Sequence, residues 1–139
     1  MKSLKTRKIA VLLLMAFLTN AMLPTANARA SDRFATYSAT LSETRDGDLC
    51  VFIMVSASGK MQKLGASVIK IQKYSDSKWI TEETYTVSTK PEIQGENTSY
   101  HCTSFNHSPQ SSNSYRAIVT FYAKDSSGQS TTEVTTNQT

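Results

Sequence analysis

Apolar and polar residues alternate most regularly near the C-terminal end of the chain, at residues 115–124. The apolar positions on one side are Tyr115, Ala117, Val119, Phe121 and Ala123. Arg116, Thr120 and Lys124 fall on the other side. Successive side chains of a β-strand point to opposite faces, so this pattern predicts a strand with one face in the core. The Asp-Ser-Ser-Gly sequence that follows predicts a turn into a last strand.

Six further segments have the composition of strands. The full predicted set is residues 34–42, 48–57, 66–74, 78–87, 98–105, 115–123 and 129–136. Asp46-Gly47 predicts a tight hairpin, because both positions of such a turn tolerate positive φ. Residues 58–67 contain two glycines and no alternation, so we expect a loop there. Seven short antiparallel strands without a long helix predict an all-β fold, a β-sandwich.

Alternation in residues 78–87 places Trp79, Thr81, Glu83, Tyr85 and Val87 on one face. Trp79 is the only tryptophan, and a large aromatic side chain buries much apolar surface in a small domain. We therefore expect Trp79 in the core. An exposed position, in which it stacks on a ligand, is the alternative.

Residues 1–30 have the three-part pattern of a secretory signal peptide. Basic residues are followed by an apolar run from Ile9 to Leu18 and by small residues at Ala26, Ala28 and Ala30. The apolar run is about ten residues long, shorter than the roughly 20 that span a bilayer. We expect cleavage after Ala28 or Ala30, with a retained N-terminal anchor as the alternative. The mature chain, residues 31–139, is predicted to be one domain that is secreted or loosely associated with the cell surface.

Removal of this segment changes the charge of the protein. The whole chain has a formal net charge of +4. Five of its 15 lysines and arginines, but none of its 11 acidic residues, lie in residues 1–30, so the mature chain has a net charge of −1. The basic character belongs to the export segment and does not predict binding to nucleic acid. No stable membrane insertion is expected after cleavage.

Two cysteines remain in the mature chain, Cys50 and Cys102. An even number of cysteines in an exported domain predicts a disulfide. In the chain-entropy model this bond is worth about 3–4 kcal/mol. The alternatives are two free thiols or a metal pair with His101. A zinc site normally needs three or four ligands, and the chain has two cysteines and two histidines, so no metal or cofactor is predicted.

The sequence SYRAIVTFYAKDSSGQS, residues 114–130, resembles the last hairpin of a fibronectin type III or immunoglobulin-like domain. The resemblance implies that Tyr115 is a corner tyrosine, whose hydroxyl group bonds to the backbone of the preceding loop. The chain departs from the immunoglobulin pattern at Ala117, where the second cysteine would stand. The expected fold is therefore a seven-stranded antiparallel β-sandwich, fibronectin III-like or immunoglobulin-like.

A longer resemblance covers most of the mature chain. Its motifs are Gly59–Gln72, Trp79 with Tyr85, and Tyr115–Ser130. They are similar to a family of small secreted proteins from Gram-positive, clostridia-like bacteria that is catalogued as a domain of unknown function. The resemblance implies an exported, single-domain bacterial protein, but it carries over no activity. The two cysteines are not part of the family pattern.

Acidic pairs in the sequence do not predict catalysis. Asp46 and Asp48 flank a glycine and could ligate calcium, but the spacing of an EF-hand is absent and a hairpin turn explains them. Glu82 and Glu83 are adjacent in a predicted strand, so they point to opposite faces and cannot act as a paired acid and base.

The histidines do not predict catalysis either. His101 and His107 lie near Cys102 in the sequence. A cysteine nucleophile needs an activated thiolate, which a cysteine held in a disulfide cannot supply. The protein is therefore predicted not to be an enzyme.

A binding surface is predicted on the outer side of the strand at residues 115–123. Four of its members lie on the side of this strand opposite the core row. The other two come from residues 66–74 and join the same face if that segment forms the neighbouring strand. The candidate binding face consists of Arg116, Ile118, Tyr122, Lys124, Tyr74 and Lys70. Aromatic and basic side chains together favour binding. Scattered exposed apolar residues without a function are the alternative.

These observations predict a secreted, non-enzymatic binding or adhesion module that engages an unknown protein or glycan. The alternative is a secreted toxin, bacteriocin-like effector or inhibitor that acts on a competitor.

Overall fold

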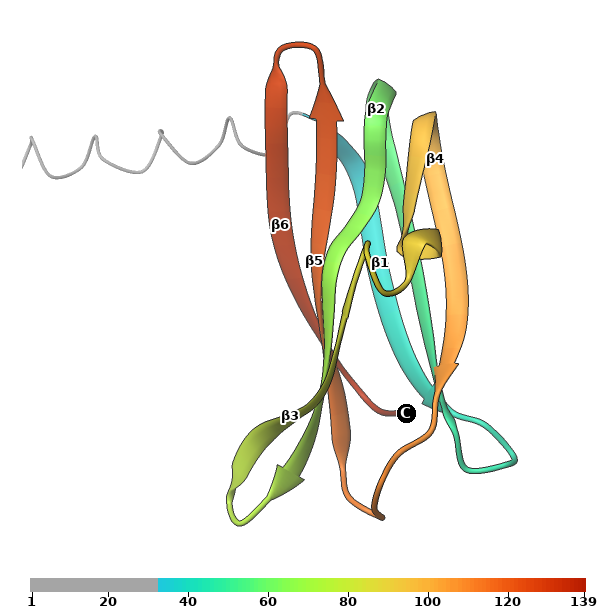
Figure 1. Cartoon of the computed structure of the whole chain (residues 1–139), viewed down its shortest axis with the longest axis vertical. Coiled ribbons are helices and arrows are strands. Elements are labelled where there is room, and N and C mark those ends of the chain that lie inside the picture. The colour runs from blue at the N-terminus through green and yellow to red at the C-terminus, as the bar shows by residue number, and fades with distance from the viewer. Residues whose placement is uncertain (1–32) are drawn as a thin grey trace, which may run out of the picture. The chain divides into compact units, whose positions relative to one another are not determined.

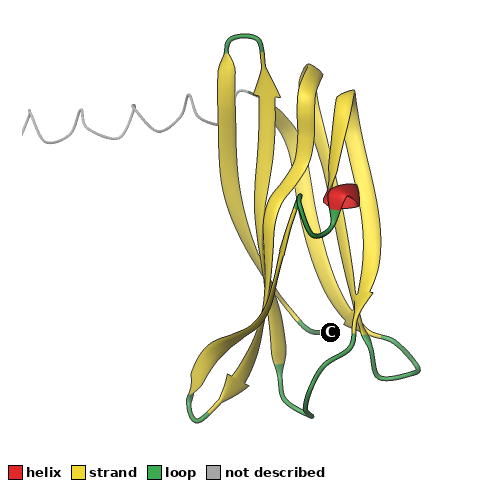
Figure 2. Cartoon of the chain, viewed as in Figure 1, coloured by secondary structure: helices red, strands yellow, loops and turns green. Residues whose placement is uncertain are grey.

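The computed structural model describes residues 33–139, and the predicted signal peptide at residues 1–30 lies outside this range. Six strands account for most of the described chain (Figures 1 and 2): β1 (Phe34–Glu43), β2 (Leu49–Ser75), β3 (Lys78–Thr86), β4 (Gln94–His107), β5 (Tyr115–Asp125) and β6 (Gly128–Asn137). A short 3-10 helix, η2 (Pro91–Ile93), precedes β4. Within the described range, no helix has the length and apolar character needed to cross a membrane. The fold is all-β, as the alternation predicts.

β2 organises the sheet, because it pairs with four other strands. Its first half lies between β1 and β4, its last part lies between β5 and β3, and β6 extends the sheet beyond β5. All of these pairings are antiparallel. At Lys63 and Leu64, β2 pairs with β4 on one side and with β5 on the other. The strand bends where it changes neighbours, and the sheet curls around a core (Figure 1).

The predicted loop at residues 58–67 is wrong, because these residues continue β2. The expected strands at residues 48–57 and 66–74 are therefore parts of one strand, and the structure has six strands where seven were expected. Gly65 has φ of +153°, and a Cβ atom there would lie 2.3 Å from the carbonyl oxygen of Ile93. The pairing of β2 is also irregular between Ser56 and Met61 and between Ala66 and Val68. The glycine thus marks a bend where two backbones approach closely, not the end of a strand.

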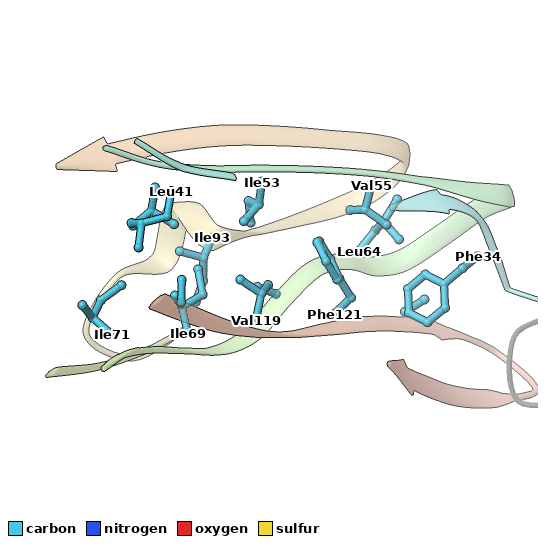
Figure 3. Packing of buried hydrophobic residues seen from close by; sticks show 14 of the residues in the cluster. Phe34, Leu41, Ile53, Val55, Leu64, Ile69, Ile71, Ile93, Val119 and Phe121 are labelled. Atoms are coloured by element: carbon cyan, nitrogen blue, oxygen red, sulfur yellow. The ribbon is translucent and has the colours of Figure 1, made fainter. Parts of the chain in front are cut away.

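The core fills the inside of the curled sheet (Figure 3). Its largest fully buried side chains are Phe121, Leu41, Leu49, Ile53, Leu64, Ile69, Ile71, Ile93, Val51, Val55 and Val119. The predicted inward row of β5 is confirmed, because all five of its members are buried. Ile93 comes from η2, so the short helix also packs on the core.

The predicted disulfide is wrong: Cys50 and Cys102 are both free thiols. They lie on neighbouring antiparallel strands but out of register. Cys50 pairs with Asn106, whereas Cys102 pairs with Met54, further along β2. An offset of four residues corresponds to about 13 Å along the strand. Disulfides require Cα atoms within about 7 Å of each other, so the register keeps the two thiols apart.

The curled sheet is fastened at one end by contacts between β1 and the residues after β6. Leu41 forms a parallel bridge with Gln138. The Thr139 N–H donates to the Leu41 carbonyl at 3.0 Å, and the Glu43 N–H donates to the Thr139 carbonyl at 3.3 Å. The first and last strands therefore meet at this end.

An ion pair fastens the start of β1 to the turn between β5 and β6. The Arg33 Nε and Nη2 atoms donate to the two carboxylate oxygens of Asp125, at 3.0 and 3.1 Å. Asp125 also accepts hydrogen bonds from the N–H groups of Ser127 and Gly128. These contacts confirm the turn that the Asp-Ser-Ser-Gly sequence predicts.

Candidate functional site

Two adjoining hollows open at the end of the molecule that carries loop 108–114, the connection between β4 and β5. Their volumes are about 430 and 520 Å³. Both hollows are lined by Glu43, Asn113, Ser114, Tyr115 and Gln138. The larger one is also lined by Trp79 and Asn137. Residues from four separate segments of the chain thus meet at one site.

Loop 108–114 is held in place by backbone and side-chain hydrogen bonds. The Tyr115 hydroxyl group lies 3.0 Å from the carbonyl oxygen of Ser111. This contact confirms the corner tyrosine that the resemblance implies. The Asn113 Nδ2 atom donates to the Tyr74 carbonyl, and the Tyr74 N–H donates to the Ser114 carbonyl, both at 2.8 Å. The wall that the loop contributes is therefore tied to β2 and β5.

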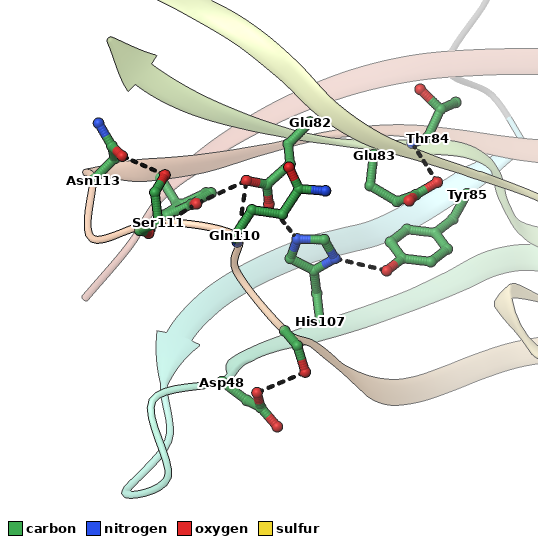
Figure 4. Close-up of polar contacts among 11 residues, drawn as sticks. Asp48, Glu82, Glu83, Thr84, Tyr85, His107, Gln110, Ser111 and Asn113 are labelled. Carbon is green, nitrogen blue, oxygen red and sulfur yellow. Dashed lines mark hydrogen bonds and ion pairs between the residues drawn. The ribbon is translucent and has the colours of Figure 1, made fainter.

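A buried carboxylate lies behind this loop (Figure 4). The Glu82 side chain is 1% exposed. It accepts hydrogen bonds from His107 Nε2 at 2.6 Å, from the Tyr115 hydroxyl group at 2.9 Å and from the Gln110 N–H at 3.3 Å. Burial alone would raise the pKa of Glu82, but the hydrogen bonds from His107, Tyr115 and Gln110 outweigh it and lower this pKa. Glu82 therefore stays ionised and holds β4, β5 and loop 108–114 together.

His107 extends the network to a second tyrosine (Figure 4). Its Nδ1 atom lies 2.7 Å from the Tyr85 hydroxyl oxygen. A neutral His107 with its proton on Nε2 satisfies both contacts, because it donates to Glu82 and accepts from Tyr85. Burial, followed by the charges of Glu83 and Glu82, raises the pKa of Tyr85. The tyrosine therefore remains a hydroxyl donor.

A bulge in β3 brings Glu82 into this network. Glu83 pairs with Ile71 and Thr81 pairs with Gln72, which leaves Glu82 as an extra residue on β3. The bulge also shifts the alternation, so Trp79 and Tyr85 no longer share a face. Tyr85 packs against the core. The expectation that Trp79 lies in the core is wrong, because it pairs with the exposed Tyr74 and is itself only half-buried.

Trp79 instead belongs to a cluster on the outer side of the sheet. The Arg116 guanidinium lies over its ring, with 4.5 Å from Cζ to the ring centroid. The Tyr74 and Trp79 ring centroids are 5.2 Å apart. The Arg116 Nε atom donates to the Gln72 side chain at 2.8 Å. We refer to Tyr74, Trp79 and Arg116 as the aromatic–arginine cluster.

The six residues of the candidate binding face divide into two groups. Arg116 and Tyr74 belong to the aromatic–arginine cluster. Lys70 pairs with Ile118, which follows Arg116 on the same face of β5, so Lys70 and Ile118 lie beside this cluster. Tyr122 and Lys124 lie further along β5, where the Tyr122 hydroxyl group donates to Gln129.

The remaining candidates have structural contacts. Asp48 accepts a hydrogen bond from Ser108, and Gly47 has φ of +83°, as the predicted hairpin turn requires. His101 Nε2 lies 2.9 Å from the Glu92 carbonyl oxygen, apart from His107 on β4. Among residues 33–139, no three His, Cys, Asp or Glu side chains are grouped closely enough to hold a metal ion.

Sequence reasoning missed the Glu82 network and the two hollows. The signal for Glu82 was present, because two adjacent glutamates in a strand force one of them toward the core side. Glu43, Asn113 and Asn137 carried no such signal, since they come from separate segments that only the tertiary fold brings together.

Comparison of the chain with models of known protein families, and with curated protein sequences, finds no match. A function for this protein has to be inferred from the chemistry of its own side chains.

Proposed function

We propose that this protein is a secreted, non-enzymatic binding or adhesion module that uses the aromatic–arginine cluster to contact its ligand. The observation that carries the proposal is the position of Arg116 over Trp79 on the outer side of the sheet, beside the exposed Tyr74. Tryptophan, tyrosine and arginine are the residues that contribute most binding energy at protein interfaces. The single tryptophan here lies outside the core, half-buried between Tyr74 and Arg116, and part of it is accessible to a ligand.

A structural role for the Glu82 network supports a non-enzymatic function. The carboxylate and imidazole of Glu82 and His107 are 1% and 7% exposed, and both ring nitrogens of His107 have partners. A general acid or base needs to reach the proton it transfers. The polar atoms of Glu82 and His107 instead make hydrogen bonds that connect β3, β4 and β5.

The topology supports a relation to immunoglobulin-like and fibronectin III-like sandwiches. β2 supplies one strand to the β1–β2–β4 part of the sheet and another to the β3–β2–β5–β6 part. We propose that these two parts correspond to the two layers of such a sandwich. The Tyr115 contact with Ser111 is a feature of the same folds. On the signal-peptide pattern and the sequence motifs alone, we further propose that the chain belongs to the small secreted bacterial family that it resembles.

The proposal is tested by capture of a ligand on the secreted protein. The immobilised protein is incubated with the cell-wall fraction and the culture supernatant of the producing organism. Wild type is compared with a Lys70→Ala, Arg116→Ala variant. A matched control carries Tyr122→Phe and Lys124→Ala, on the same face but away from the cluster. We expect the control to retain the ligand and the first variant to lose it.

Equal retention by both variants would overturn a role for the aromatic–arginine cluster. A parallel assay adds the purified protein to cultures of other bacteria. Growth inhibition without any retained ligand would favour a secreted toxin, bacteriocin-like effector or inhibitor instead.

A further inference from the structure

We infer that the two adjoining hollows beside loop 108–114 bind a neutral oligosaccharide, with Trp79 as its stacking surface. This inference rests on the proposed function and names a ligand class for it. It comes from the side chains that line the hollows, from their charge and from the way their walls are held.

The lining combines the aromatic side chains of Trp79 and Tyr115 with hydrogen-bonding groups of both kinds, and Arg116 covers one face of the Trp79 ring, so the other face is the stacking surface. Trp79 lines the larger hollow together with the amide group of Asn137 and the hydroxyl group of Ser114. A sugar ring has an apolar C–H face that packs on an indole and hydroxyl groups at its edge that donate and accept hydrogen bonds. Pockets that select a ligand combine apolar contact with a few placed polar groups in this way. Each hollow also falls in the size range of small-molecule sites, about 300–1,000 Å³.

Charge excludes other ligand classes. Glu43 is the only charged side chain among the residues that line the two hollows. A phosphate or carboxylate ligand would be repelled by this negative charge, and the adjacent Arg116 guanidinium is already engaged with the Trp79 ring and the Gln72 side chain. A wholly apolar ligand would remove the amide and hydroxyl groups from water without replacing their hydrogen bonds, which costs free energy. A neutral ligand rich in hydroxyl groups avoids both costs.

Some lining side chains are fixed and others are free. Gln138 accepts a hydrogen bond from the Tyr115 N–H at 3.2 Å and donates one to Glu43 at 3.0 Å, so its side chain is held in place. Over the described part of the chain, the side chains of Ser114 and Asn137 make no hydrogen bond. They are therefore available to a ligand. A preformed wall reduces the conformational entropy lost on binding.

The inference is tested by fluorescence, because Trp79 is the only tryptophan in the chain. The secreted protein is titrated with chitotetraose, cellotetraose and mannotetraose as neutral probes and with tetragalacturonate as an anionic probe. We expect a saturable change in Trp79 emission with at least one neutral probe and a weaker response to the anionic probe.

Two variants locate the response. Asn137→Ala removes a free amide group from the larger hollow and is expected to weaken binding about tenfold. Gln129→Ala removes an amide group at the opposite end of β6 and should leave the affinity unchanged. The inference is overturned if no neutral probe gives saturation at about 10 mM, if tetragalacturonate binds more tightly, or if Asn137→Ala binds as wild type does.

Failure of this inference is distinguishable from failure of the proposed function. Retention that depends on Lys70 and Arg116, without any response to the neutral probes, overturns the sugar site and leaves the binding module intact. A retained ligand that is protease-sensitive, with no sugar response, identifies a protein partner and also overturns the sugar site. A sugar response that depends on Asn137, with equal retention by both capture variants, supports the sugar site and rejects a role for Lys70 and Arg116.

Discussion

Glu82 Oε2 and His107 Nε2 lie 2.6 Å apart, although 25 positions separate the two residues in the sequence. This contact joins the bulge of β3 to the last residue of β4. The same carboxylate also reaches the Gln110 N–H and the Tyr115 hydroxyl group. One ionised side chain therefore connects three segments behind the candidate site.

Replacement of Glu82 by glutamine should destabilise the protein. Glutamine has the same size but no charge, so its hydrogen bonds from His107 and Tyr115 are weaker, and its amide group adds a donor that lacks an acceptor. We expect the free energy of unfolding to fall by about 2–3 kcal/mol, measured by urea denaturation. Glu83→Gln is the matched control, because Glu83 is exposed, and should change stability by less than about 0.5 kcal/mol. Equal effects of the two substitutions would contradict the structural role of Glu82.

Stability should also depend on pH through Glu82. Its pKa is lowered in the folded protein, so the unfolded chain binds a proton more readily. The stabilisation is complete above the unfolded-state pKa of about 4.3 and is lost as the pH falls through the lower folded-state pKa. Urea unfolding between about pH 5 and pH 3 should therefore show a steeper loss for wild type than for Glu82→Gln. Parallel curves would rule out this contribution.

The pH experiment needs a second variant, because another carboxylate titrates in the same direction. Hydrogen bonds from Arg33 and then Ser127 lower the pKa of Asp125 well below its usual range. Asp125→Asn removes this contribution and leaves that of Glu82 in place. The double variant should lose less stability in acid than either single variant.

Gly65 should tolerate no side chain. A Cβ atom at this position would lie 2.3 Å from the Ile93 carbonyl oxygen and 2.6 Å from the Gln94 Cα atom, and φ is +153°. Gly65→Ala is expected to cost more than about 3 kcal/mol, or to prevent folding, as judged by circular dichroism and thermal melting. Gly59→Ala is the control, since nothing lies within 4 Å of its Cβ position. A stable Gly65→Ala protein would contradict the close approach of β2 and β4.

The thiols should be independent of each other. Because Cys50 and Cys102 are out of register, addition of dithiothreitol is expected to leave the melting temperature unchanged. A disulfide worth about 3–4 kcal/mol would instead lower it by more than 10 °C on reduction, by an order-of-magnitude conversion. Thiol titration should find two reactive groups per unfolded chain, and Cys102, which is exposed, should react first in the folded protein.

The sequence predicted those parts of the fold that depend on local alternation. The inward row of β5 and the turn at Asp125 are correct because period-two alternation and turn chemistry act over a few residues. The continuation of β2 through residues 58–67 was missed, since a glycine that permits a bend looks the same as one that ends a strand. The inward position of Glu82 and the outward position of Trp79 were missed for one shared reason, a bulge that shifts the alternation by one residue.

The cysteines illustrate a different difficulty. The predicted export of the chain and its even number of cysteines favoured a disulfide, and the strands that carry Cys50 and Cys102, β2 and β4, are indeed neighbours. Register decides whether neighbouring cysteines meet, and it is set by the packing of whole strands. The hollows at the end of the molecule could not be predicted for a similar reason. Their walls come from segments far apart in the chain, which only the tertiary fold brings together.

The 27 residues of β2 have a consequence for how the chain folds and fails. Among residues 33–139, the strand pairs that do not involve β2 are the β5–β6 hairpin and a single bridge between Leu41 and Gln138. An isolated hairpin is only marginally stable in water. The sheet therefore forms only when β2 has paired with strands that precede it and strands that follow it in the sequence. Pairings between segments far apart in the sequence are typical of slow folding. A protease cut in loop 108–114 would spare every strand pairing, whereas a cut near Lys63 would separate the part of β2 that pairs with β1 and β4 from the part that pairs with β3 and β5.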